Sequence, residues 1–199
     1  MTLTERLHRA LQTETPLAQL LIGDFPDLPG PDDGLPTPAA VLVAIVDRPE
    51  PGVILTVRTD TVRRHAGQVA FPGGRIDPED DGPVAAALRE AEEEIGLPRS
   101  AVQVIGTADR YRTVTGFDVT PVLGVVPPGL NFTLQPDEVA AVFEAPLHYL
   151  LEPGHQSVRT VEWDGNERRY YEILWEGQRI WGATAAMIVN LSHRLAPAL

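Results

Sequence analysis

The sequence predicts a single α/β domain in which helices pack on a mixed β-sheet. The chain has 199 residues, 43% of them hydrophobic, which is enough to bury one sizeable core. Apolar runs of strand length outnumber the segments with helical periodicity. These runs are not separated by regular helical crossovers, which favours a mixed-sheet sandwich over a doubly wound parallel fold.

The N-terminal part is expected to be a helical addition to this domain. Leucines at positions 3, 7 and 11, and again at 17, 20 and 21, predict one or two amphipathic helices within residues 3–22. Residues 25–38 contain five prolines and predict an irregular connector. We therefore expect residues 1–38 to form an N-terminal segment and residues 39–199 to form the main domain.

The sheet is expected to come from apolar runs that are bounded by turn residues. These runs occupy residues 39–46, 53–58, 101–108, 117–126 and 138–147, the last of which mixes a strand with a helix start. A short strand and loop are expected over 68–74. A late hairpin is predicted around residues 164–166, and a closing helix is predicted over 181–195.

Composition excludes several classes of protein. The chain has no cysteine, which excludes disulfides and cysteine-ligated zinc and fits a cytoplasmic location. No apolar run reaches the roughly 18 residues needed to span a bilayer, and the first residues do not resemble a signal peptide. The formal net charge of −12 argues against non-specific binding of nucleic acid. We therefore expect a small-molecule partner rather than a membrane or a nucleic acid.

Charge is distributed unevenly along the chain. Residues 58–75 contain four arginines and one aspartate, whereas residues 77–94 contain eight acids and one arginine. A local basic patch or a bound cation can attract an anionic substrate to a protein with negative net charge. The border between the two segments is therefore the candidate site.

The acidic segment is predicted to form an amphipathic helix. Pro83 suits the first turn of a helix, and Gly96 suits the position just past its end. The apolar residues between them share one face at helical spacing: Val84, Ala87, Leu88, Ala91 and Ile95.

Three of the four glutamates in this helix fall on one side. Glu90 and Glu94 lie beside the apolar stripe, Glu93 lies one step further round, and Glu92 lies on the other flank. Like-charged pairs at i,i+4 destabilise a helix by roughly 0.2–0.5 kcal/mol. A solvated helix face would be expected to carry basic partners, yet Arg89 stands alone. A hard-cation site is the alternative, because Mg²⁺ takes carboxylate oxygens together with substrate phosphates.

Residues 73–97 resemble the Nudix signature, G-x5-E-x7-R-E-U-x-E-E-x-G-U, where U is aliphatic. Its second half is matched without a gap by Arg89, Glu90, Ala91, Glu93, Glu94, Gly96 and Leu97. The first half departs, because the signature glutamate, which is usually structural, is matched only by Asp80 or Asp81. The resemblance implies a Nudix-type α/β/α sandwich with terminal helical additions, and it favours the cation site over the solvated face.

The resemblance also implies roles for the acidic helix. The reaction would be hydrolysis of a nucleoside diphosphate linked to another moiety, with Mg²⁺ or Mn²⁺ as cofactor. Glu90 and Glu94 would be the first metal ligands, and Glu93 would be a third ligand or a base that acts through water. Arg89 would hold a glutamate in position by a charge-assisted hydrogen bond.

A base from a later loop is an alternative to Glu93. Asp137 and Glu138 precede a predicted strand, in a position from which a carboxylate could reach the metal, and Glu138 is the preferred candidate. Glu144 is a weaker candidate, because it is expected near a helix start before Pro146. The loop over residues 111–117 could close over the substrate.

Residues 54–74 resemble a second signature, L-L-T-x-R-[SA]-x3-R-x3-G-x3-F-P-G-G, which marks the coenzyme A pyrophosphatase subfamily. The matching residues are Leu55, Thr56, Arg58, Arg63, Gly67, Phe71, Pro72, Gly73 and Gly74. Ile54 and Thr59 are mild departures, and residues 180–185 resemble the subfamily more weakly. Coenzyme A carries a 3′-phosphate beside its pyrophosphate, and the planar fork of arginine suits phosphate. The resemblance implies cleavage of coenzyme A into 3′,5′-ADP and 4′-phosphopantetheine or its acylated forms.

Substrate contacts are therefore expected along this stretch. The candidate binding residues are Arg58, Arg63, Arg64, His65, Gln68, Phe71, Gly73 and Gly74. The arginines and the histidine would contact phosphates, and the glutamine and the glycine backbone would shape the pocket. Each has a plainer alternative: a surface charge for the arginines, a structural role for His65, a core position for Phe71, and a tight loop for the glycines.

Two rival functions stay open. A Nudix hydrolase of ADP-ribose, NADH or another dinucleotide would use the same acidic helix, and only residues 54–74 distinguish it. A catalytically silent nucleotide-binding module would usually have lost its glutamates, whereas Glu90, Glu93 and Glu94 are all present.

Overall fold

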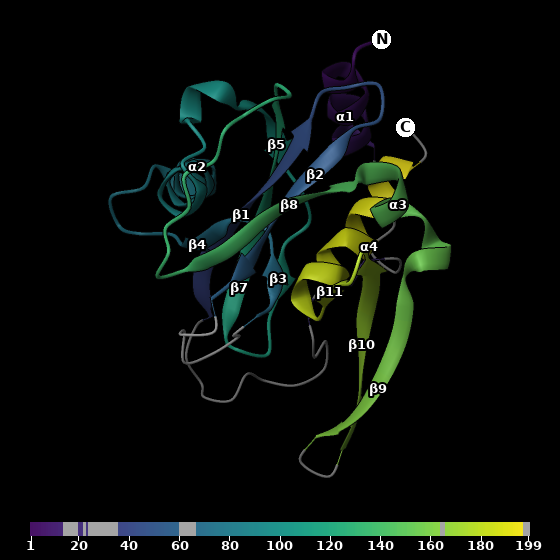
Figure 1. The fold of residues 1–199 in the computed structure, drawn as a ribbon. Coiled ribbons are helices and arrows are strands. Elements are labelled where there is room, and N and C mark those ends of the chain that lie inside the picture. The colour runs from purple at the N-terminus through teal and green to yellow at the C-terminus, as the bar shows by residue number, and fades with distance from the viewer. Residues whose placement is uncertain (14–19, 22, 24–35, 60–66, 164–165, 197–199) are drawn as a thin grey trace.

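The structure is a computed structural model, and it describes residues 1–13, 20–21, 23, 36–59, 67–163 and 166–196 (Figure 1). In chain order the helices and strands are α1 (Leu3–Gln12), β1 (Thr37–Val46), β2 (Gly52–Arg58), β3 (Val69–Ala70), β4 (Gly73–Arg75), α2 (Gly82–Ile95), η2 (Arg99–Ala101), β5 (Gln103–Thr107), β6 (Tyr111–Arg112), β7 (Phe117–Val126), β8 (Val139–Pro146), α3 (Leu147–Leu151), η3 (Pro153–His155), β9 (Ser157–Trp163), β10 (Asn166–Trp175), β11 (Gln178–Trp181) and α4 (Ala183–Leu195).

The main sheet is mixed, as predicted. β1 and β7 pair in parallel at its centre, over ten residues from Thr37 beside Phe117 to Val46 beside Val126. The other strand pairs are antiparallel, and the central order is β3-β2-β1-β7-β5. β4 pairs with β1, β8 with β2 and β6 with β7. The antiparallel pairings on both sides of one parallel pair explain why the sequence shows no regular helical crossovers.

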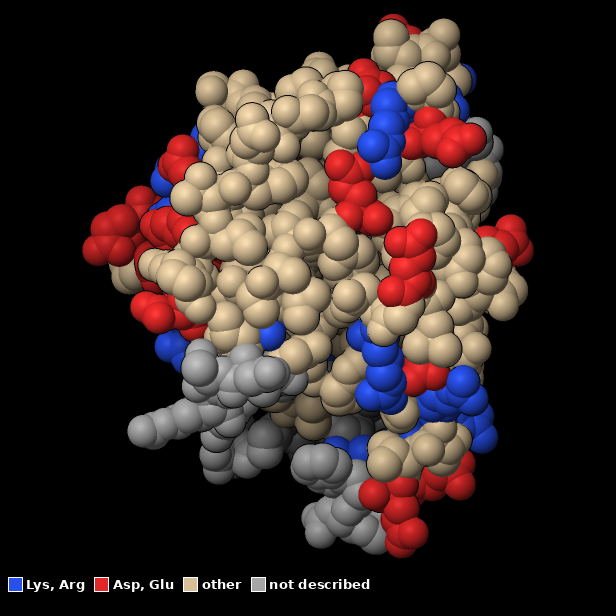
Figure 2. Space-filling view, viewed as in Figure 1, with Lys and Arg blue, Asp and Glu red and all other residues tan. Residues whose placement is uncertain are grey.

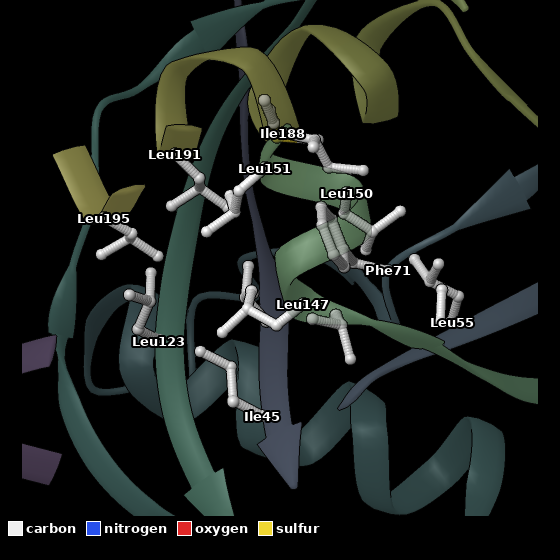
Figure 3. Close-up of a cluster of buried hydrophobic side chains, with 14 of the residues drawn as sticks. Ile45, Leu55, Phe71, Leu123, Leu147, Leu150, Leu151, Ile188, Leu191 and Leu195 are labelled. Atoms are coloured by element: carbon white, nitrogen blue, oxygen red, sulfur yellow. The ribbon is translucent and has the colours of Figure 1, made fainter. Parts of the chain in front are cut away.

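Helices cover both faces of this sheet, which confirms the α/β/α sandwich (Figure 1). α2 covers one face, where Ala87, Ala91 and Ile95 pack on sheet residues such as Leu42 and Ile54. α1, α3 and α4 cover the other face. Figure 3 shows this second core, in which leucines of α3 and α4 meet side chains of the sheet. Each fully buried aliphatic side chain stabilises the fold by roughly 1.5–3 kcal/mol.

The limits predicted for the acidic helix are confirmed by α2. The helix begins at Gly82 with Pro83 in its first turn, and it ends at Ile95. Gly96 has a φ of 67°, and its N–H donates to main-chain carbonyls of the last turn. Glycine suits this left-handed position because it has no Cβ to clash with the turn.

The late hairpin is confirmed, but it belongs to a second sheet of three strands. Trp163 pairs with Asn166 across the β9–β10 hairpin. β11 was not predicted. The backbone turns back at Glu176 and Gly177, which have φ values of 44° and 80°. Two successive positive φ angles are typical of a two-residue β-hairpin, so the Glu-Gly pair was the available signal.

Of the one or two helices predicted within residues 3–22, the described residues show α1. α1 ends at Gln12, and its residues Leu3, Leu7 and Ala10 are buried in the second core, which confirms the amphipathic pattern there. Residues 14–19 and 22, and most of the expected connector, lie outside the described residues. Of the described helices, none is long and apolar enough to cross a membrane.

Candidate active site

The guanidinium of Arg89 lies at the centre of a network between α2 and the loop that precedes it. Its Nε and Nη2 donate to the two carboxylate oxygens of Asp80 at 3.0 and 2.8 Å. Its Nη1 donates to Glu90 at 2.9 Å and to Glu93 at 3.0 Å. Its Nη2 also donates to the carbonyl of Arg75 in β4 at 3.0 Å. A planar fork that contacts three carboxylates holds the helix and β4 together.

The structure selects Asp80 as the acid that stands in for the signature glutamate. Its side chain is 7% exposed and forms a bidentate pair with Arg89. The hydrogen bond from Arg89 lowers the pKa of Asp80, and a bond from the N–H of Asp77 adds to this effect. Asp81 instead occupies the position before α2, where its side chain makes no capping bond. Sequence spacing alone left these two acids equivalent.

Two glycines allow β4 to approach the acidic helix closely. The N–H of Gly73 donates to a carboxylate oxygen of Glu94 at 3.1 Å. A Cβ on Gly74 would lie 2.5 Å from the carboxyl group of Glu90, and a Cβ on Gly73 would lie 2.4 Å from the carbonyl oxygen of Ala40 in β1. A side chain at Gly73 would collide with the backbone of β1, whereas one at Gly74 would displace the carboxyl group of Glu90. The glycines therefore bring backbone directly against the two predicted metal ligands.

Glu94 is a buried carboxyl group with little charge compensation. Burial raises the pKa of Glu94 to about 7, although the N–H of Gly73 acts in the opposite direction. The charges of Glu90 and Glu138 raise this pKa further, and the charge of Arg58 lowers it. Burial also raises the pKa of Glu90, against the effect of its bond to Arg89. The two carboxylates resist ionisation because no nearby cation fully balances them.

The loop before β8 brings Glu138 to the same site. Gln135 donates its backbone N–H to the carbonyl of Glu94 at 2.9 Å, and the N–H of Glu138 donates to the carbonyl of Gln135 at 3.0 Å. Thr59, which follows β2, donates its backbone N–H to the carbonyl of Glu138 at 3.0 Å. The charge of Glu138 raises the pKa of both Glu90 and Glu94. Its carboxylate is thus within electrostatic reach of the predicted ligands.

Arg58 lies at the end of β2, next to this loop. Its backbone pairs with Val139 after a register shift in the β2–β8 ladder, and its N–H donates to the carbonyl of Gln68 at 2.9 Å. Its Nε is buried and has no hydrogen-bond partner among the described residues. Because its charge acts on Glu94, the structure brings the basic stretch and the acidic helix together at this point.

Other predicted residues have different outcomes. Arg63, Arg64 and His65 lie outside the described residues. Phe71 is 3% exposed and belongs to the core on the α4 side. The structure therefore favours the core alternative for Phe71 over a stacking surface, because its ring is enclosed by other apolar side chains.

Glu92 and Glu144 have structural partners. Glu92 forms an exposed ion pair with Arg99 at 2.8 Å, as expected for the glutamate on the outer flank. Glu144 pairs with Arg48 at 2.6 Å and lies next to Gly52, at the opposite end of β2 from the site. This position argues against Glu144 as the base.

The comparisons with known proteins agree with this geometry. The family model described as "NUDIX domain" matches residues 36–168. This chain belongs to the Nudix family. Relatives named "Uncharacterized Nudix hydrolase NudL" from Cronobacter sakazakii and Escherichia coli are 49% and 48% identical over 157 residues, which cover 79% of this chain and 82% of each relative.

A solved structure shares the fold over nearly the whole chain. It is a MutT/nudix family protein from Enterococcus faecalis, with a TM-score of 0.52 and 15% identity, and the match covers 99% of this chain and 70% of the other. At this identity the likeness concerns the fold alone. Together with the family match it supports the assignment of this chain as a Nudix hydrolase, a class of enzymes that generally uses divalent metal ions.

The carboxylates of this Nudix hydrolase fit a divalent cation in part. Glu90 and Glu94 offer oxygen donors of the kind that hard cations prefer, and burial makes their uncompensated charge unfavourable without a cation. Among the residues that the structure describes, no three acidic or histidine side chains are grouped so that they could hold a metal ion. The side chain of Glu93 is 58% exposed and accepts from the same Nη1 of Arg89 as Glu90 does. Its role as a ligand stays a prediction.

Replacement of Gly74 by alanine should separate activity from stability. The new methyl group would displace the carboxyl group of Glu90, and a misplacement of about 1 Å at a catalytic centre can lower the rate roughly 100-fold. The end of a glutamate side chain can move at little cost, so we expect the melting temperature to change little. Thermal unfolding and pyrophosphate hydrolysis would be measured for Gly74→Ala.

Gly154→Ala is the matched control, because the atom nearest to its new Cβ lies at 3.7 Å, an ordinary contact. A large fall in melting temperature for Gly74→Ala alone, with catalysis preserved, would contradict the close approach of β4 to Glu90.

Glu94 should make the metal-free protein less stable as the pH rises. Its pKa is about 7 in the folded protein and 4.5 for a glutamate in an unfolded chain, so the folded state binds more protons between these values. The destabilisation is absent below pH 4.5, grows through pH 7, and reaches on the order of 3 kcal/mol. Urea unfolding at pH 5 and pH 8 with a chelator should show this loss in the wild type, and Glu94→Gln should reduce it.

Glu92→Gln is the control for this measurement, since Glu92 is exposed and paired with Arg99. Addition of Mg²⁺ at pH 8 should stabilise the wild type more than Glu94→Gln. An identical pH dependence in wild type and Glu94→Gln would refute the buried, poorly compensated state of this carboxyl group.

Proposed function

We propose that this Nudix hydrolase cleaves the pyrophosphate bond of coenzyme A and its derivatives, giving 3′,5′-ADP and 4′-phosphopantetheine or its acylated forms. The observation that carries the proposal is the junction of residues 54–74 with α2. The stretch that resembles the coenzyme A subfamily begins in β2, supplies Arg58 beside Glu94, and ends at the two glycines that contact Glu90 and Glu94. The two sequence signatures therefore meet in one site.

The carboxylates have complementary roles in this proposal. Glu90 and Glu94 would hold the divalent cation, either Mg²⁺ or Mn²⁺. When bound, such a cation neutralises charge on a pyrophosphate and lowers the pKa of a water molecule. Glu138 or Glu93 would accept the proton from the attacking water. Arg89 fixes the direction of Glu90 and Glu93 and is a positioning residue.

The basic stretch would bind the phosphates. Arg58 lies at the end of β2, where its charge acts on Glu94, and Arg63, Arg64 and His65 follow it in sequence. Arginine suits phosphate because its fork matches two phosphate oxygens. Gln68 and the glycine backbone would line the same region, since the carbonyl of Gln68 accepts the N–H of Arg58.

The rival substrates are ADP-ribose, NADH and other dinucleotides. They contain the same pyrophosphate link, so the acidic helix would act on them in the same way. They lack the 3′-phosphate of coenzyme A, and a row of arginines is more than a plain pyrophosphate link requires. The silent-module alternative would not need a buried carboxylate such as Glu94, which destabilises the metal-free protein.

The purified protein with Mg²⁺ is expected to hydrolyse coenzyme A faster than ADP-ribose or NADH. The extra arginine contacts to a 3′-phosphate explain the preference, because hydrogen bonds between charged groups contribute roughly 1.5–3 kcal/mol each. The measurement is chromatographic separation of products from the three substrates at equal concentration. No cleavage of coenzyme A would overturn the proposal, and no turnover of any substrate would support the silent module.

A further inference from the structure

The outer face of the sheet β9–β10–β11 carries arginine and aromatic side chains. Residues opposite each other in an antiparallel pair point to the same face. Arg159 is opposite Tyr170, and Trp181 is opposite Glu172, whereas Ile173 of β10 points to the other face and is buried in the core. We call this set the outer-face cluster: Arg159, Tyr170, Glu172, Arg179 and Trp181.

Glu172 holds the two arginines of the cluster in fixed directions. One carboxylate oxygen accepts from Nε of Arg159 at 2.8 Å, and the other accepts from Nε of Arg179 at 2.6 Å. The side chain of Glu172 is 9% exposed. The hydrogen bond from Arg179, followed by the bond from Arg159, lowers the pKa of Glu172. An ionised carboxylate that is enclosed in this way orders both guanidinium groups before any ligand arrives.

The aromatic rings extend this ordered surface. The guanidinium of Arg179 lies 4.8 Å from the ring centroid of Trp181 and 5.8 Å from that of Tyr170. Arg179 also donates to the hydroxyl of Tyr170 at 2.9 Å. The side chains of Arg159 and Arg179 are still 51% and 46% exposed. The cluster thus presents cationic, planar groups to solvent, and these suit a ligand with both phosphate and an aromatic ring.

The strand that carries Arg179 and Trp181 is linked to the basic stretch through β3. β11 packs against β3, and Thr184 at the start of α4 donates its hydroxyl to the carbonyl of Val69 in β3 at 3.1 Å. β3 in turn pairs with β2, which ends at Arg58. Figure 1 shows β11 beside β3, with the β9–β10 hairpin extending away from the sandwich. A ligand that reached past Arg58 in the direction of β3 would approach the cluster.

The charge on this face is opposite to that of the whole protein. The chain has a net charge of −12, and Figure 2 shows many acidic side chains at the edge of the molecule where α2 lies. On the described part of the outer face, Arg159, Arg168 and Arg179 stand against Glu172, so three positive charges minus one negative charge leave +2. Such a local excess attracts anions.

We propose that the outer-face cluster binds the 3′-phosphorylated adenosine end of the substrate, remote from the bond that is cleaved. Arg159 and Arg179 contact the 3′-phosphate in addition to the arginines of the basic stretch, and Trp181 with Tyr170 packs against the purine ring. The inference rests on the proposed function, because coenzyme A is the substrate with such an end. It assigns specificity to residues that lie 64 to 86 positions beyond Ile95, the last residue of α2.

The test compares Arg179→Gln and Arg159→Gln with Arg169→Gln, using coenzyme A and 3′-dephospho-coenzyme A in the presence of Mg²⁺. Arg169 is the matched control, since it lies on β10 but its side chain is 77% exposed and its ion-pair partner Glu167 is 3.9 Å away. Loss of one charge-assisted hydrogen bond should raise KM for coenzyme A about tenfold. The value of kcat should stay within about twofold, and KM for the dephospho form should change much less.

Unchanged KM values in both folded cluster variants would overturn the inference and leave the proposed function intact. If the variants do not fold, or if the wild type does not cleave coenzyme A, calorimetric titration of the wild type decides. Adenosine 3′,5′-bisphosphate should bind about tenfold more tightly than adenosine 5′-monophosphate, because its 3′-phosphate forms an additional charge-assisted hydrogen bond with the cluster. Equal affinities would overturn the inference, whatever the outcome for coenzyme A turnover.

Discussion

Four carboxyl groups and one guanidinium share the narrow space between α2 and β4. The balance between their negative and positive charges determines the electrostatics of the site. Arg89 donates to Asp80, Glu90 and Glu93. Glu94 receives only a backbone N–H from β4 within this set, and it is buried. The acids are therefore of two kinds: three share the single positive charge of Arg89, and Glu94 has no direct bond from Arg89. Burial opposes ionisation of both Glu90 and Glu94. A divalent cation would bind where this opposition is greatest.

The parallel pair β1–β7 fixes the position of β4, whose backbone contacts Glu94 and Arg89. β4 pairs with β1, Gly73 has no room for a side chain against the backbone of β1, and a side chain at Gly74 would displace the carboxyl group of Glu90. A shift of β4 along β1 would move the N–H that contacts Glu94 and the carbonyl that accepts from Arg89. Core packing on both faces of the sheet thus determines the electrostatics of the acidic helix.

Local signals in the sequence predicted some features well and could not reach others. Pro83, Gly96 and the spacing of the glutamates defined α2, because helix limits depend on neighbouring residues. The choice between Asp80 and Asp81 depends on which carboxyl group reaches Arg89 once the loop has folded. β11 was missed because its turn carries a glutamate at a positive φ, which is uncommon for that residue. Arg63, Arg64 and His65 lie outside the described residues, so their contacts with phosphate stay predictions.

The loop that carries Glu138 also closes the C-terminal end of α2. The N–H groups of Thr133 and Gln135 donate to the carbonyls of Ile95 and Glu94, which belong to the last turn and have no partner within the helix. Separation of the loop from the helix would leave these carbonyls to solvent and would loosen the turn that holds Glu94. The helix and the loop therefore belong to one cooperative unit, in which amide hydrogens of both would exchange with solvent through the same opening event.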